Sequence, residues 1–208
     1  MKKKKLICFF IILCLISILL GGCGKKEQEN DKTVDSTPSM EGVNPSANEE
    51  FYLKSSGADN SFLFNIDNYK FKRVKLWVEY YEKGEKKKDY NLGEFAEESM
   101  EQLLVSVVEK SDKQIIDIYA SCNSKNGTKR LGPITMETKP DKNYLKAIKA
   151  VDGKIDIEDG KEVYLGFVCK NKEAVTFNED SLKGEKKGED ELLRNEYAYI
   201  VKAIFYNE

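Results

Sequence analysis

"EYAYIVKAIFY", residues 196–206, carries apolar side chains on both of its alternating faces. The stretch "EVYLGFVC", residues 162–169, has the same character. A strand that reads as a continuous apolar run is typical of a sheet whose two faces are both covered. We therefore expect these two stretches to be central strands, with other strands paired beside them.

Three further stretches have the composition of strands. In "YKFKRVKLWVEYY", residues 69–81, alternate apolar side chains from Val74 to Tyr80 fall on one face at a period of two. "QLLVSVV" (102–108) and "QIIDIYAS" (114–121) are separated by a short polar segment, which predicts a hairpin. These segments predict a β-rich domain.

Glycine-bearing turns recur between the apolar segments, at Asn126-Gly127, Asp152-Gly153 and Asp159-Gly160. No dinucleotide-binding or phosphate-binding glycine motif interrupts them. The pattern predicts an all-β fold, a two-sheet antiparallel β-sandwich of about nine or ten strands with one or two short helices. Residues 188–196 are expected to form a short helix. Residues 92–104 fit either a helix or a loop followed by a strand.

The beginning of the chain has the organisation of a signal peptide. Four lysines in residues 1–5 precede an apolar run of 15 residues, Leu6 to Leu20. A membrane-spanning helix needs roughly 20 apolar residues, so the run is short for a span. It is followed at once by Gly21, Gly22 and Cys23.

Leu20-Gly21-Gly22-Cys23 resembles the lipobox of bacterial lipoproteins, an aliphatic residue and two small residues before a cysteine. The resemblance implies that residues 1–22 are removed and that Cys23 becomes the first residue of the mature chain. It also implies that the Cys23 sulfur carries diacylglycerol, with fatty acyl groups such as palmitate. The protein would then be anchored at the extracytoplasmic face of the cell membrane, on the surface of a Gram-positive-type bacterium.

The composition changes after Cys23. Almost no large apolar residue occurs before Glu50. Such a stretch cannot bury enough apolar surface to offset the entropy lost on ordering. We therefore predict three parts, which are a signal peptide (1–22), a lipidated and disordered polar tether (23–50) and a β-sandwich domain (51–208).

The charge balance argues against nucleic acid as a partner. Without Lys2 to Lys5, 30 basic residues remain against 36 acidic ones, so the mature chain carries a net charge near −6. An acidic protein gains no electrostatic attraction to phosphate backbones. We expect the membrane to be reached through the lipid anchor and no nucleic acid to be bound.

The chain contains no histidine, which removes the commonest general base and the commonest metal ligand. No catalytic motif stands out, and no metal site or non-covalent cofactor is predicted. Acidic residues are abundant, so a pair of carboxylates that meet in the fold could still support hydrolysis. Nothing in the sequence selects one pair over another.

Cys122 and Cys169 are the two cysteines of the predicted domain. Each follows apolar residues in phase along its strand, so both are expected to face the interior. Two alternatives stay open. A disulfide that closes the 46 intervening residues would contribute about 4 kcal/mol; the other alternative is two buried, unreacted thiols.

The single tryptophan suggests a binding surface. At a period of two, Trp77 and Tyr81 fall opposite the apolar face of residues 69–81, next to charged side chains. They could form a stacking platform for a sugar or a peptide, or they could pack under a neighbouring segment, as large aromatics usually do.

The sequence thus predicts a non-catalytic surface lipoprotein whose β-sandwich binds a protein, a peptide or a cell-wall glycan. Two alternatives remain, a carboxylate-dependent hydrolase of the cell envelope and a sensory or transport-accessory lipoprotein. The amino-acid sequence does not decide among these three functions.

Overall fold

A computed structural model describes residues 37–58, 60–110, 113–137 and 143–208. The elements are β1 (Ser39–Val43), α2 (Ala47–Ser55), β2 (Asn60–Asp67), β3 (Arg73–Glu82), β4 (Glu85–Ala96), β5 (Gln102–Lys110), β6 (Ile115–Ser124), β7 (Gly127–Glu137), β8 (Leu145–Ala150), β9 (Lys154–Asp156), β10 (Glu162–Asn171), α3 (Glu179–Leu182), α4 (Lys186–Leu192) and β11 (Tyr197–Tyr206).

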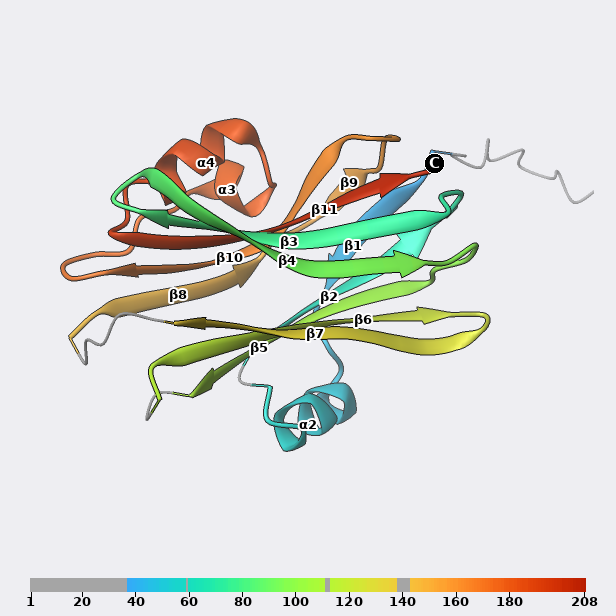
Figure 1. Ribbon diagram of the computed structural model, residues 1–208, viewed down its shortest axis with the longest axis horizontal. Helices are drawn as coiled ribbons and strands as arrows, with labels where there is room; N and C mark the ends of the chain where they lie inside the picture. The colour runs from blue at the N-terminus through green and yellow to red at the C-terminus, as the bar shows by residue number, and fades with distance from the viewer. Residues whose placement is uncertain (1–36, 59, 111–112, 138–142) are drawn as a thin grey trace, which may run out of the picture. The chain divides into compact units, whose positions relative to one another are not determined.

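The strands form two antiparallel sheets packed face to face (Figure 1). Sheet A has the order β7-β6-β5-β2-β1-β9, and sheet B has the order β4-β3-β11-β10-β8. The predicted two-sheet antiparallel β-sandwich is confirmed, with three short helices in the described residues where one or two were expected. The described residues hold eleven strands, slightly more than the nine or ten expected. The predicted hairpin is also present, because β5 and β6 pair in antiparallel register.

The continuous apolar run at residues 196–206 is β11, which lies in the middle of sheet B between β3 and β10. Its inner side chains, such as Val201 and Phe205, join the main core between the sheets. Its outer side chains Ala198 and Ile200 join a smaller cluster on the opposite face, beneath α3 and α4. Both faces are covered, which explains why the strand is apolar throughout.

A bulge in β10 changes which side chains face the core. Tyr164 pairs with Lys202 and Gly166 pairs with Val201, so Leu165 is an extra residue in β10. Leu165 faces the main core, whereas Phe167 and Cys169 point to the outer face. A bulge moves the following side chains to the other face of a strand, because their alternation has a period of two.

This bulge places the two cysteines in different apolar clusters. Cys122 on β6 packs in the main core, whereas Cys169 on β10 packs in the cluster on the outer side of sheet B. Both are free thiols. Both are buried among apolar side chains, as predicted, but in different clusters, and the disulfide alternative fails because sheet B separates the two sulfur atoms.

The predicted boundary of the tether at residue 50 was also wrong. Residues 39–43 form β1, which pairs with β2 and β9 in sheet A, and Met40 is fully buried. A single apolar side chain and a row of backbone hydrogen bonds suffice to hold a short strand at this position. Residues 1–36, with the predicted signal peptide and Cys23, lie outside the described residues.

The two helical predictions have different outcomes. The helix expected at 188–196 is present as α4, which begins at Lys186. The segment 92–104 is not helical, because β4 continues to Ala96 and β5 begins at Gln102. None of the helices within the described residues is long and apolar enough to cross a membrane.

Candidate functional site

The helix α2 is attached to the sandwich mainly by its ends. Its first turn is closed by a capping box, in which the Ser46 backbone N–H donates to Glu49 Oε2 (2.8 Å) and the Glu49 N–H donates to Ser46 Oγ (3.4 Å). Lys54 pairs with Glu50 at 2.6 Å one turn further on. None of the helix residues is buried. Local interactions therefore hold this helix, with little contribution from packing.

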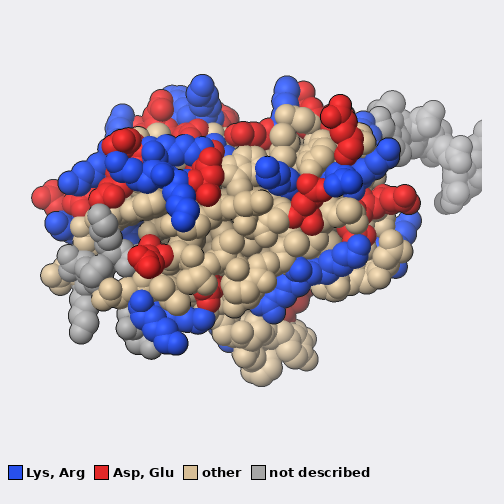
Figure 2. All heavy atoms as spheres, in the orientation of Figure 1, with Lys and Arg blue, Asp and Glu red and all other residues tan. Residues whose placement is uncertain are grey.

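Two aromatic rings stand out on this helix. Phe51 is 66% exposed and Tyr52 is 70% exposed, and their ring centroids lie 5.6 Å apart in an edge-to-face arrangement. Figure 1 shows α2 projecting from the outer face of sheet A, and in Figure 2 the projection carries mainly uncharged residues. Adjacent apolar side chains with this exposure are typical of a contact surface for a partner.

A groove of about 250 Å³ lies between α2 and the outer face of sheet A, and we call it the α2 groove. The sheet supplies an apolar row, in which Leu63 of β2 lies directly opposite Leu104 of β5. A polar row runs beside it, with Gln102 opposite Asn123 and Asn123 opposite Thr128. The complete lining is Glu49, Tyr52, Leu53, Leu63, Gln102, Leu104, Ser121, Asn123 and Thr128.

A second hollow of about 290 Å³ lies on the other side of the helix. Leu53 lines both hollows, so α2 stands between them. The Ser61 hydroxyl oxygen faces this second side and is buried, and no described residue forms a hydrogen bond with it. A buried hydroxyl without a partner costs free energy, and a bound polar group could satisfy it.

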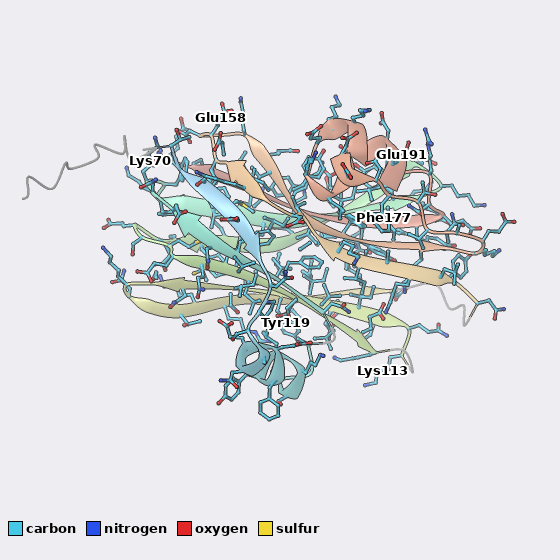
Figure 3. The ribbon with its side chains drawn as sticks, turned by 180° about the vertical axis from the view of Figure 1, so that it is seen from behind. Lys70, Lys113, Tyr119, Glu158, Phe177 and Glu191 are labelled. Atoms are coloured by element: carbon cyan, nitrogen blue, oxygen red, sulfur yellow. The ribbon has the colours of Figure 1, made fainter. Side chains whose placement is uncertain are left out.

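A positive charge lies on the same face of sheet A as the α2 groove. The Arg130 guanidinium stacks on the ring of Tyr119 at 4.0 Å from the centroid. Arg130 is paired in register with Ser121, which lines the groove. Tyr119 is labelled near α2 in Figure 3. Sequence reasoning missed this whole surface, because α2 falls in the segment that composition assigned to the tether and the domain boundary.

The predicted surface of Trp77 and Tyr81 is not an open platform. Both side chains lie on the outer face of sheet B, opposite the core, as the period of two predicted. Tyr81 is only 8% exposed, however, because it packs in the cluster beneath α4 with Leu192. Trp77 is half-buried, and its indole N–H donates to Glu79 Oε1 at 3.4 Å. For Tyr81, packing under a neighbouring segment is the alternative that the structure supports.

The same face holds a buried ion pair that the sequence analysis did not single out. Lys202 Nζ lies 2.8 Å from Glu79 Oε2, and the two residues are 4% and 5% exposed. Burial alone would raise the pKa of Glu79, but hydrogen bonds from Lys202, Lys86 and Tyr81 outweigh it and lower the pKa to about 2. The pKa of Lys202 is raised, because contact with Glu79, Glu189 and Glu162 outweighs its burial.

Glu79 also lies near a second carboxylate. The Tyr81 hydroxyl lies within hydrogen-bond distance of Glu79 Oε2 (2.8 Å) and of Glu189 Oε1 (3.1 Å). In the described part of the chain, the pKa shifts of the carboxyl groups are all downward, at Glu49, Glu50, Glu79, Glu94, Glu97 and Asp117. A glycosidase-type general acid requires a raised pKa. This environment suits a structural ion pair better than an acid and base pair.

No group of three or more Asp, Glu or Cys side chains within the described ranges could hold a metal ion. The α2 groove itself offers apolar walls and a row of amide and hydroxyl groups, with two exposed aromatic rings on the helix beside it.

Comparison with known proteins gives one family. The model of the YgaN domain matches residues 40–205, which is most of the chain and includes all of the strands from β2 to β10. No curated protein and no solved structure matches the chain.

Proposed function

We propose a function for this chain, which belongs to the YgaN domain family: it is a membrane-anchored lipoprotein whose β-sandwich binds another protein without catalysing a reaction. On this proposal the signal peptide is cut before Cys23, and diacylglycerol on the Cys23 sulfur holds the protein at the extracytoplasmic face. Each buried methylene of an acyl chain contributes about 0.8 kcal/mol, so two or three chains give stable attachment.

The observation that carries the binding role is the exposed aromatic pair of α2 beside an apolar groove. Phe51 and Tyr52 are the two most exposed of the large apolar side chains in the described ranges. They sit on a helix without a buried residue, next to the groove floored by Leu63 and Leu104. Aromatic anchors next to a hollow that accepts an apolar side chain are typical of protein interfaces.

The composition of the groove favours a protein over a glycan. Tyr52, Leu53, Leu63 and Leu104 make its walls largely apolar, and Glu49 is the only charged residue that lines it. An apolar side chain of a partner would remove this surface from water, and the amides of Gln102 and Asn123 could bind the partner's backbone. A sugar could bind the polar row with some of its hydroxyl groups, but those that lie against the leucine side chains would have no hydrogen-bond partner.

The carboxylate-dependent hydrolase is the weaker proposal. The carboxylates of Glu79 and Glu189 both lie within hydrogen-bond distance of the Tyr81 hydroxyl and next to the ammonium group of Lys202. Glu79 is held ionised and buried, so it could not reach a substrate without movement of the elements around it.

Methyl NMR of the full chain tests the proposed binding role. The peptide acetyl-Gly-Ser-Leu-Ser-Gly-amide is titrated in, with the same peptide carrying Gly in place of Leu as its control. We expect the methyl resonances of Leu63 and Leu104 to shift with the leucine peptide alone. If an oligomer of N-acetylglucosamine shifts them and the leucine peptide does not, protein binding at this groove is wrong.

A further inference from the structure

The connection between β10 and β11 forms a small cap on the outer face of sheet B. It contains α3 and α4, which lie over the ends of β3, β10 and β11 (Figure 1). Beneath it is a cluster that is separate from the main core and consists of Tyr81, Phe167, Cys169, Leu192, Ala198 and Ile200. Among the described residues of the cap, Leu192 is the one large apolar side chain that is fully buried, at 2% exposure, and the polar Asn195 is buried as well. Val175, Leu182 and Leu193 are only partly buried against the cluster.

The cap is tied together internally. The Ser181 hydroxyl of α3 donates to the Gly188 carbonyl of α4 at 2.8 Å. A side chain at Gly188 would lie 2.1 Å from the Ser181 backbone nitrogen, so the two helices are in close contact there. At the end of α4, the Asn195 side-chain amide donates to the Thr176 carbonyl and accepts from the Thr176 N–H. These bonds let α3 and α4 move as one body.

Its polar attachment to the sheet is concentrated on one side chain. Glu189 of α4 accepts a hydrogen bond from the Tyr164 hydroxyl, and it lies 3.1 Å from the Tyr81 hydroxyl, which Glu79 also contacts at 2.8 Å. Its carboxylate also lies 3.6 Å from Lys202 Nζ. A second attachment is the backbone hydrogen bond from Asp152 N–H to the Leu182 carbonyl, at 2.5 Å.

The ion pair under the cap does not depend on the cap. Lys202 and Glu79 both belong to sheet B and contact each other at 2.8 Å, and Lys86 on β4 also reaches Glu79 at 2.8 Å. If Glu189 withdrew, Lys202 would keep its closest counter-ion. Opening would therefore leave no isolated charge on the sheet, which keeps its free-energy cost low.

We propose that α3 and α4 open as one unit while both sheets remain folded, and that Glu189 is the latch that holds them closed. Opening exposes an apolar face made by Phe167, Ala198 and Ile200, bordered by the Glu79–Lys202 pair. Segments with few buried apolar contacts open at lower free energy than a core does. The closed cap thus shields a second apolar surface, distinct from the α2 groove on the other sheet.

The two buried thiols report directly on this opening. Cys169 lies under the cap and Cys122 lies in the main core, and burial raises the pKa of the Cys169 thiol to about 12. A buried thiol reacts only when the structure around it opens. Cap opening exposes Cys169 alone, whereas unfolding of the whole domain exposes both.

The experiment measures labelling of the full chain by N-ethylmaleimide, with each cysteine followed by peptide mass spectrometry. Rates are divided by those of the urea-unfolded chain. We expect Cys169 to react at least about tenfold faster than Cys122. Glu189→Gln should raise the labelling rate of Cys169 about tenfold further and leave that of Cys122 unchanged, because the charge that strengthens its hydrogen bonds and its contact with Lys202 is lost.

The matched control is Glu191→Gln on the same helix, since Glu191 pairs with Arg194 within the cap itself (Figure 3 labels Glu191). It should leave the Cys169 rate near that of the natural chain. Equal labelling rates of Cys122 and Cys169 in the natural chain would overturn the proposal, whatever the variants do. A parallel rise of both rates in Glu189→Gln would show that Glu189 supports the whole domain and is not a latch.

Discussion

Glu79 on β3 and Lys202 on β11 form an ion pair of 2.8 Å on the outer face of sheet B, with both side chains almost fully withdrawn from water. They are diagonal neighbours, because Glu79 is paired in register with Ile200 and Trp77 with Lys202. Lys86 also contacts Glu79 at 2.8 Å, whereas Glu79 is the closest counter-ion of Lys202, so removing the Glu79 charge leaves a buried ammonium group poorly compensated.

Glu79→Gln is expected to lower the free energy of unfolding by about 3 kcal/mol at pH 7, at the lower end for a broken buried pair. The value is at the lower end because Glu189 and Glu162 each lie 3.6 Å from Lys202. Urea unfolding followed by circular dichroism measures it. The control is Glu158→Gln, which removes an exposed pair with Lys161 and should cost less than about 0.5 kcal/mol. Equal effects of the two substitutions would show that the buried pair contributes no more to stability than an exposed one.

The contribution of Glu79 should depend on pH in a defined window. Its pKa is about 2 in the folded protein, below its ordinary value of 4.5. A lowered folded pKa stabilises the protein at pH values above 4.5, and this stabilisation is lost as the pH falls from there toward 2. The difference in unfolding free energy between the natural chain and Glu79→Gln should therefore shrink by about 2 kcal/mol from pH 6 to pH 3. A constant difference across this range would show that Glu79 is not held ionised.

Gly166→Ala tests the packing at the β10 bulge. A Cβ atom at this position would lie 2.5 Å from the Phe62 ring and 2.6 Å from the Lys149 carbonyl oxygen. We expect a loss of about 2 kcal/mol in unfolding free energy from overpacking. In a Phe62→Leu background the same change should cost about 1 kcal/mol less, since only the clash with the carbonyl remains. If the losses in unfolding free energy of the two substitutions simply add, the Phe62 ring is not the source of the strain at residue 166.

The sequence was informative where the alternation of side chains is uninterrupted. β11, β3 and the β5–β6 hairpin follow their apolar pattern without a break, so their existence and central or paired position could be predicted. For β10 the strand could be predicted but the facing of its side chains could not, because the extra residue Leu165 moves Phe167 and Cys169 to the other face. A bulge leaves no mark in the order of apolar residues beyond a glycine such as Gly166, and many glycines mark turns.

The candidate site was harder to predict than the fold. β1 contributes one large buried side chain, Met40. The overall composition of the polar segment gives no sign of this single residue. α2 has no apolar stripe, so its capping box at Ser46 and Glu49 was its clearest sequence signal. Trp77 and Tyr81 were placed on the correct face, but the cap that covers Tyr81 comes from a segment more than 100 residues further along the chain. Coverage by a distant segment cannot be derived from the periodicity of a strand.

Cys23→Ala is expected to abolish lipid attachment and signal cleavage. Cells that express the variant should accumulate the uncut chain, without incorporation of labelled palmitate. Cys14→Ala, in the apolar run, is the matched control and should retain both processing and label. Palmitate incorporation into the Cys23→Ala chain would contradict the proposed anchor.

Photo-crosslinking in intact cells tests the binding role of the α2 groove most directly. The full chain carries benzoylphenylalanine in place of Tyr52, which is 70% exposed at the mouth of the groove. We expect a discrete crosslinked protein that disappears when Leu104→Thr is added, a change that keeps strand propensity and removes the apolar floor. The same probe at Glu158, an exposed position outside the groove, should give no such product. A product that persists in the Leu104→Thr chain, or that forms equally from Glu158, would contradict the proposal that this groove binds a partner protein.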